Sequence, residues 1–287
     1  MKFGIAFANA GPLADPDLLA HLAVEAERVG IESLWTVEHV VIPVGYTSEY
    51  PYARSGKMPG PENIAIPDPL LSLAYAAAVT RTIRLATGVL ILPQRHPFYV
   101  AKEVATLDVL SRGRVILGIG VGWLKEEFDA LGIPFEERAG RTHETVRAMR
   151  ELWKEGPSTF EGKYFRWSAV ESWPKPVQPG GVPVVLGGHT DLAAKRAARY
   201  GNGFFPGRAD EARTIELLGI LREECARVGR DPAEIEITLP MPGHKLDRIQ
   251  RLRDLGAARL TMGVPGFDKQ GITDGLNRFV DEIASKL

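Results

Sequence analysis

Two ionisable side chains close a short stretch of buried-strand character near the start of the chain. Residues 33–37 read SLWTV, and the run stops at Glu38 and His39. A histidine titrates near neutral pH and can donate or accept a proton, while a neighbouring carboxylate can orient a ligand hydroxyl. The pair predicts a proton-transfer site with His39 as its catalytic residue. An exposed loop dipeptide is the alternative interpretation.

Glycines interrupt two later stretches that otherwise have strand character. In residues 86–97, ATGVLILPQRHP, Gly88 is typical of a bulge or of a ligand that approaches the backbone. In residues 117–128, LGIGVGWLKEEF, Gly118, Gly120 and Gly122 alternate as the strand runs out. Alternating glycines leave one face of the backbone bare, so a flat ring or a phosphate could lie against it.

A candidate anion site follows a strand in residues 184–208, VVLGGHTDLAAKRAARYGNGFFPGR. Gly187 and Gly188 end the strand, and Thr190 opens a helix whose exposed N–H groups can hold an anion. Arg208, just beyond the next strand, could pair with the same anion. A plain turn with an ordinary N-cap is the alternative.

The sequence lacks several common catalytic patterns. Its six histidines show no H-E-x-x-H or similar metal spacing, so we expect no metal site, and neither G-x-S-x-G nor a P-loop occurs. No lysine follows a late strand, where a Schiff-base aldolase barrel needs one. Metal hydrolase and class I aldolase functions are therefore disfavoured.

Composition is that of an ordinary globular protein with a large core. The chain has 287 residues, 45% of them hydrophobic and 25% charged, and a formal net charge of -1. This balance favours neither a nucleic-acid nor a membrane partner, and no apolar run is long enough for a signal or a membrane span. The single Cys225 fits a reducing compartment. We expect a cytoplasmic protein.

Hydrophobic periodicity predicts alternating strands and helices. The expected strands are Lys2–Ala8, Ser33–Val37, Ile83–Leu90, Arg114–Gly118, Val182–Leu186, Gly203–Phe205, Glu236–Leu239 and Arg259–Met262. Helical patterns follow each of them, among them Asp68–Arg81, Pro97–Leu110, Arg141–Trp153, Thr190–Tyr200, Asp210–Val228 and Lys245–Leu255. Eight such units predict one α/β domain over residues 1–287, a (β/α)8 TIM barrel. An open doubly wound sheet is the alternative, but its first turn should carry G-x-G-x-x-G, which is absent.

A barrel places chemistry at the carboxyl ends of its strands, which is where Glu38 and His39 fall. Two long insertions interrupt the alternation: Pro43–Pro67 after strand two, and Gly156–Gly181 before strand five. Their aromatic content favours ordered pocket walls over disorder. We expect these walls and the neighbouring strand ends to supply a substrate pocket formed by Tyr46, Tyr50, Tyr52, Arg54, Trp123 and Trp167.

Nearly the whole chain resembles the bacterial luciferase-like superfamily of barrel oxidoreductases, and most closely its deazaflavin (coenzyme F420)-dependent branch. The resemblance rests on LWTVEHVVIP, on IRLATGVLILPQRHP, and on the block RVILGIGVGWLKEEFDALGIPFEERAGRTHE. FEGKYFRW, PKPVQP, VPVVLGGHTDLAAKRAARYGNGFFP and RLTMG extend it. The G-x-G-x-G-W-x-x-x-E-F-x-A-L-G-x-P-F-x-x-R block is specific for the superfamily.

This resemblance implies that a deazaflavin ring lies at the barrel mouth, backed by a bulge with a non-proline cis peptide between Gly88 and Val89. It also implies that Glu38 approaches a cofactor hydroxyl and that His39 is a proton donor beside the ring. Trp123 replaces the carboxylate of a sugar-phosphate-oxidising subgroup, which argues against that substrate. The implied cofactor-binding residues are Glu38, His39, Thr87, Gly88, Val89, Gly120, Val121, Gly122, Gly187, Gly188, His189, Thr190 and Arg208.

Two other functions remain open. An FMN-dependent monooxygenase is the first, although luciferase-like FMN binders carry an arginine where this chain has Val121. A non-catalytic flavin-binding protein is the second, and the retention of His39 with both glycine stretches argues against it. The resemblance further implies a homodimer acting on a small-molecule substrate that the sequence does not identify.

Overall fold

Parallel strands close into a barrel in the computed structural model, which describes residues 1–207 and 211–287. The strands are β1 (Lys2–Ala6), β2 (Ser33–Thr36), β3 (Arg84–Thr87) with its continuation β4 (Leu90–Ile91), β5 (Val115–Gly120), β8 (Val184–Gly187), β9 (Gly203–Phe205), β10 (Glu236–Pro240) and β11 (Ala257–Met262). They pair in the order β3-β2-β1-β11-β10-β9-β8-β5, and β3 also pairs with β5, which closes the ring. The predicted eight-stranded barrel is confirmed.

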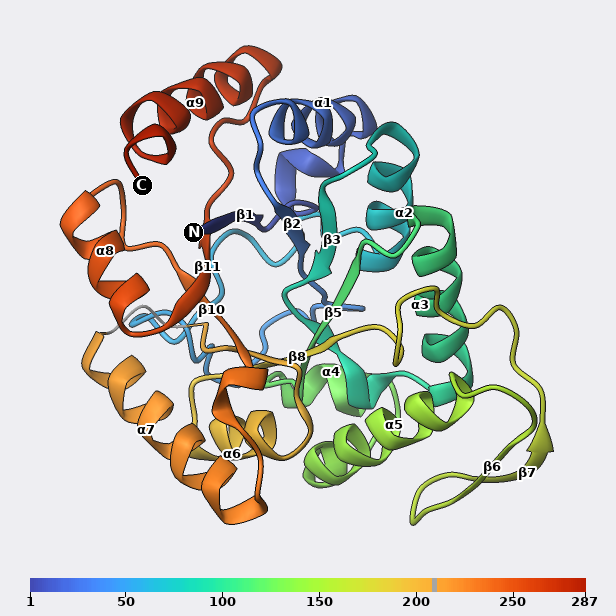
Figure 1. Cartoon of the computed structure of the whole chain (residues 1–287). Coiled ribbons are helices and arrows are strands. Elements are labelled where there is room, and N and C mark those ends of the chain that lie inside the picture. The colour runs from blue at the N-terminus through green and yellow to red at the C-terminus, as the bar shows by residue number, and fades with distance from the viewer. Residues whose placement is uncertain (208–210) are drawn as a thin grey trace.

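Helices surround the barrel as an outer ring (Figure 1). They are α1 (Pro16–Arg28), α2 (Pro69–Val79), α3 (Pro97–Ser111), α5 (Arg138–Leu152), α6 (Asp191–Tyr200), α7 (Glu211–Val228), α8 (Leu246–Asp254) and α9 (Lys269–Glu282). Local sequence explains where several begin: the Asp15 and Asp68 side chains accept amide N–H groups at the starts of α1 and α2, each followed by a first-turn proline. None of the helices in the described ranges has the length and apolar character of a membrane span.

A short helix and a β-hairpin were not predicted. The short helix α4 (Lys125–Ala130) stands between β5 and α5. Strands β6 (Ser158–Glu161) and β7 (Arg166–Val170) form an antiparallel hairpin within the second insertion, outside the ring of helices (Figure 1). The insertion before strand five is therefore ordered, but much of it lies on the outer surface of the molecule.

The core consists of two apolar regions. The larger one lies between the barrel and the helices, and a smaller cluster fills the barrel with one residue each from β2, β3, β5, β8 and β9: Trp35, Ala86, Ile116, Val185 and Phe205. The rings of Trp35 and Phe205 pack edge to face with centroids 5.2 Å apart. Because Trp35 lies only a few residues before the end of β2, this cluster forms the floor beneath the barrel mouth, meaning the carboxyl-terminal end of the strands.

A candidate active site at the barrel mouth

His39 lies just past the end of β2, with one ring nitrogen held by a buried carboxylate. Its Nδ1 is 2.9 Å from Oε2 of Glu127, and the two side chains are 8% and 0% exposed. Its ring packs edge to face on Trp123 with centroids 5.7 Å apart. Within the described part of the chain, Nε2 has no hydrogen-bond partner. This nitrogen is therefore the one that a ligand or substrate can use.

Glu38 is engaged by protein groups. Its carboxylate accepts hydrogen bonds from the Ile91 amide and from Arg95, whose Nε is 2.9 Å away, and Arg95 also pairs with Asp68. Burial raises the pKa of the Glu38 carboxyl, although Arg95 opposes the shift. We therefore reinterpret Glu38: the carboxylate predicted to approach a cofactor hydroxyl joins the end of β2 to the segment that follows the bulge.

The peptide bond between Gly88 and Val89 is cis, as predicted. It separates β3 from β4, and the Thr87 hydroxyl donates to the carbonyl of Gly118 at 2.6 Å. Thr87, Gly88 and Val89 therefore lie together at the mouth. The resemblance implies that this bulge supports the deazaflavin ring.

The alternating glycines have a different role from the one predicted. A Cβ atom on Gly118 would lie 1.9 Å from the Thr87 carbonyl oxygen, and one on Gly120 would lie 2.6 Å from Val89. A Cβ on Gly187 of β8 would also lie 2.6 Å from Val89. The backbone face was expected to be bare, but the chain's own bulge fills it. A ring bound at this place would contact the side chain of Val89, because Val89 covers the backbone of Gly120 and Gly187.

The last glycine of the motif ends the strand. Gly122 has a φ of +81°, and a Cβ on it would lie 2.5 Å from Phe128. Val121 before it is partly exposed. Gly122 thus turns the chain into α4, and its importance for a ligand is indirect.

Aromatic side chains form a continuous wall across the mouth, as predicted for the first insertion. Trp123 packs edge to face against Tyr46 and Tyr50, with centroids 5.6 and 5.2 Å away. Tyr50 packs on Tyr52 at 5.4 Å, and Tyr52 packs on His189 at 5.0 Å. The wall therefore runs from the end of β2 to the end of β8. Burial raises the pKa of the Tyr50 hydroxyl, so this phenol stays protonated and can donate a hydrogen bond.

Arg54 is exposed to solvent two residues after Tyr52 of the wall, and its place in the pocket stays a prediction. The other predicted pocket residue outside this wall lies elsewhere. Trp167 belongs to the β6–β7 hairpin, where its ring stacks on Phe160 at 4.9 Å and packs on Phe98 at 4.7 Å, and its Nε1 donates to Ser158. The prediction that Trp167 forms a wall of the mouth is corrected, because the hairpin directs this side chain into its own apolar core.

The anion site was predicted at the turn between β8 and α6, and the structure shows how this turn is built. The Thr190 side chain caps α6 by accepting the Ala193 amide at 3.2 Å, and Gly188 has a φ of +120°. The carbonyl of His189 accepts from Arg213 Nε at 3.3 Å. Arg208 lies outside the described residues. Arg213, in the first turns of α7, is a cation beside this turn that the sequence reasoning missed.

Helix α4 supplies two further residues that were missed. Glu127 holds His39, and the adjacent Glu126 holds the first insertion. The Glu126 carboxylate accepts from the Ser48 hydroxyl at 2.6 Å and from the Thr47 amide at 2.7 Å. These donors hold the pKa of Glu126 well below its usual range. Glu127 is the specified glutamate of the superfamily block W-x-x-x-E-F, which was a signal for its importance but not for its partners, whereas Glu126 stands at an unspecified position of that block.

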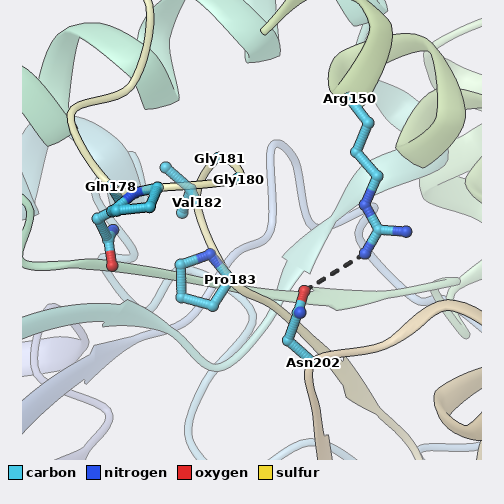
Figure 2. A pocket seen from close by; sticks show the side chains of 8 residues that line it. Arg150, Gln178, Gly180, Gly181, Val182, Pro183 and Asn202 are labelled. Carbon is cyan, nitrogen blue, oxygen red and sulfur yellow. Dashed lines mark hydrogen bonds between the residues drawn. The ribbon is translucent and has the colours of Figure 1, made fainter. Parts of the chain in front are cut away.

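A cavity of about 380 Å³ lies at the opposite end of the barrel, before β8 and β9. It is lined by Arg150, Asn202 and the glycine-rich segment 178–183. Arg150 donates to the Tyr200 carbonyl at 2.7 Å and to the Asn202 side chain at 3.3 Å, as Figure 2 shows for the second contact. Arg150 is engaged by the Tyr200 carbonyl and the Asn202 side chain. None of the described residues that line this cavity is a histidine, a cysteine or a carboxylate, so we consider the mouth the better candidate for the chemistry.

The fold, the cis peptide and the mouth define a barrel oxidoreductase, and comparison with known proteins agrees. Residues 1–270 match the family model for luciferase-like monooxygenases, and the chain belongs to that family. It is 32% identical to an uncharacterised protein of Mycobacterium tuberculosis over 291 residues, covering 100% of this chain and 99% of that one. It is 33% identical over 230 residues to an F420-dependent glucose-6-phosphate dehydrogenase of Kineococcus radiotolerans, covering 78% and 63% of the two chains. A solved monooxygenase of Streptomyces bottropensis shares the fold with a TM-score of 0.79 at 24% identity, covering 100% and 99%.

Proposed function

We propose that the protein transfers a hydride between coenzyme F420 and a small organic substrate at the barrel mouth. The observation that carries the proposal is His39: its Nδ1 is held by a buried carboxylate, and its Nε2 is left for a ligand beside an aromatic wall. The similarity to an F420-dependent dehydrogenase supports the choice of cofactor, as does Val121 at a position where FMN-binding relatives carry arginine.

The residues at the mouth fit a flat heterocycle with an anionic tail. Val89 and the bulge provide an apolar support, and Trp123 and Tyr50 provide the facing aromatic surface. The α6 start suits a phosphate because the first turn of a helix presents backbone N–H groups. Arg213 beside it is paired with the carboxylates of Asp191 and Glu216, at 2.6 Å each, so it is not counted as a phosphate partner. When bound, the deazaflavin supplies the hydride chemistry.

The protein's own contribution is orientation and proton management. Removing a hydride from an alcohol or an amine also releases a proton, and the reverse reduction consumes one. His39 Nε2 accepts or donates that proton, because it is the ring nitrogen without a hydrogen-bond partner among the described residues and an imidazole can carry a proton in either direction. The aromatic wall limits the access of water, which strengthens the electrostatic interactions in the site.

Cofactor titration tests the proposal. We expect coenzyme F420 to change the intrinsic fluorescence of the protein saturably, because Trp123 lies in the wall of the mouth, and we expect FMN to have little effect. Turnover is then measured with a panel of alcohols, enones and imines. Binding of FMN but not F420 would instead support the monooxygenase function, and F420 binding without turnover of any substrate would support a non-catalytic binding protein.

A further inference from the structure

Glu127 makes three contacts from a fully buried position at the start of α4. Its Oε1 accepts the backbone amide of Val40 at 2.6 Å and that of Val41 at 3.3 Å. Its Oε2 lies 2.9 Å from Nδ1 of His39. A backbone N–H can only donate, so Oε1 is an acceptor. The same carboxylate therefore joins the backbone just before the long insertion to the imidazole ring.

We infer that Glu127 is a positioning residue that selects the tautomer of His39, with the hydrogen on Nδ1 and the lone pair on Nε2. An imidazole nitrogen that faces a carboxylate oxygen must carry the hydrogen, because an ionised carboxylate only accepts. The other nitrogen of the neutral ring is then left as an acceptor. The tautomer itself does not depend on the proposed function, whereas its use in catalysis rests on it.

The surroundings keep the ring in this orientation. Trp123 packs edge to face on it at an interplanar angle of 85°, and the amides of Val40 and Val41 fix the carboxylate from its other side. A ring flip would exchange Nδ1 for a carbon atom and leave the 0% exposed Glu127 side chain without its donor. When Nε2 takes up a proton, the positive charge of the ring lies next to this carboxylate, which stabilises it.

A purely structural role makes a different prediction. If Glu127 only held the backbone of Val40 and Val41, any side chain that accepts from these two amides could replace it. The tautomer of His39 would then not change. Glu127→Gln separates the two roles. The two amides keep the carboxamide oxygen on their side, so the NH₂ group faces Nδ1 of His39. Nδ1 must then accept, and the hydrogen moves to Nε2.

The test is nitrogen-15 NMR of the full-length protein labelled at histidine, without cofactor or substrate. His39→Gln identifies the signals of His39 among the six histidines. We expect Nδ1 to carry the hydrogen in the wild type and Nε2 to carry it in Glu127→Gln. Glu126→Gln is the matched control, because it makes the same substitution one residue earlier in α4 at a carboxylate that binds Ser48 and not His39. It should leave the His39 tautomer as in the wild type.

A wild-type ring with its hydrogen on Nε2 overturns the inference without any variant, and so does a folded Glu127→Gln protein with an unchanged tautomer. In single-turnover hydride transfer with F420, Glu127→Gln should be about 10²-fold slower, with no further loss when added to His39→Gln. A further loss in the double variant would contradict action through His39. Failure of the proposed function is distinguishable, because no variant would then turn over while the NMR result would stand.

Discussion

The amino-terminal and carboxyl-terminal ends of the barrel differ in how their polar side chains are paired. At the amino-terminal end, Arg259 of β11 is 0% exposed and donates to Glu32 and Glu236, each at 2.6 Å. Arg114, before β5, donates to carbonyl groups of the α2–β3 connection and to Thr80. Both arginines donate to acceptors of the protein itself. The polar side chains at this end therefore stabilise the fold and are not available to a ligand.

At the mouth, pairing is incomplete and the surfaces are aromatic. His39 has a hydrogen-bond partner at Nδ1 but none at Nε2 among the described residues. The ring of Trp123 packs beside it, and Tyr50 packs on Trp123. Structural ion pairs occur at both ends, as Glu38 and Arg95 show at the mouth, but the mouth also leaves one imidazole nitrogen without a partner among the described residues. Substitutions at the two ends should therefore separate activity from stability.

The largest expected effect is on activity at the mouth. Replacing His39 by Gln should lower F420-dependent turnover by on the order of 10²–10⁴, about 3 to 5.5 kcal/mol, because the amide cannot carry a proton at neutral pH. Steady-state rates with a substrate found in the panel measure this.

Two controls accompany it. The dissociation constant for F420 should stay within about threefold of the wild type, since the phosphate site proposed at the start of α6 lies at the other side of the mouth. The unfolding midpoint should fall less than that of Arg259→Met, because Glu127 keeps the amides of Val40 and Val41 and the Gln side chain can donate to its other oxygen. A variant that loses stability and activity together would mean that His39 belongs with the structural charges and not with the site.

The next effect is on stability at the amino-terminal end. Arg259→Met should lower the free energy of unfolding by about 3 kcal/mol, because it leaves Glu32 and Glu236 without their shared buried partner. The two carboxylates are 22% and 32% exposed and can recover some hydration, so we expect the low end of the range for broken buried pairs. Urea unfolding measures the change.

A matched control uses an exposed ion pair. Arg166→Met removes the partner of Glu161 at 3.0 Å, but both side chains are more than 70% exposed, so the loss should be below about 1 kcal/mol. The rate per folded molecule of the Arg259 variant should be close to that of the wild type. Equal losses of stability in the two variants would remove the contrast between the barrel end and the surface.

The sequence could locate the strands and the end of the barrel at which His39 and the aromatic residues of the first insertion gather. Each strand is an apolar run bounded by turn residues, and a barrel assigns chemistry to strand ends, so His39 and the tyrosine wall followed. What could not be predicted depends on contacts between distant residues. Glu127 meets His39 across 88 positions, and nothing near either residue in the sequence indicates the pairing.

The glycines and Trp167 were singled out in the sequence, but their roles could not be predicted because these depend on distant neighbours. Gly118 and Gly120 were correctly marked as unusual, but the reason, the carbonyl of Thr87 and the side chain of Val89, lies on a different strand. Trp167 was assigned to the mouth because its insertion is long and aromatic. The β6–β7 register, which pairs Phe160 with Trp167, places it in a hairpin core instead. Alternating aromatic residues around Gly162 were a hairpin signal that was not used.

A pH effect on stability should appear at the amino-terminal end. Glu27 accepts the amides of Arg81, Thr82 and Ile83, and although burial opposes it, these donors lower its pKa from 4.5 to about 2. A depressed folded pKa gives stability that is complete above the unfolded value and is lost as pH falls from about 4.5 toward about 2. Glu27→Gln should remove about 1 to 2 kcal/mol of this dependence, after allowing for partial exposure. Urea unfolding at pH 3 and pH 7 measures this difference in the free energy of unfolding. If the difference were the same in the wild type and in Glu27→Gln, the prediction would be contradicted.

The smallest effect should fall on substrate binding at the mouth. Glu126 holds the first insertion through Thr47 and Ser48, and that insertion carries Tyr46 and Tyr50 of the aromatic wall. Glu126→Gln keeps one acceptor but loses its charge, so the wall should be held about 1 kcal/mol less tightly and KM should rise about fivefold. Because Glu126 makes no contact with His39, kcat should change by less than about twofold, which steady-state kinetics can separate. A fall in kcat with KM unchanged would place Glu126 with the proton carrier and not with the wall.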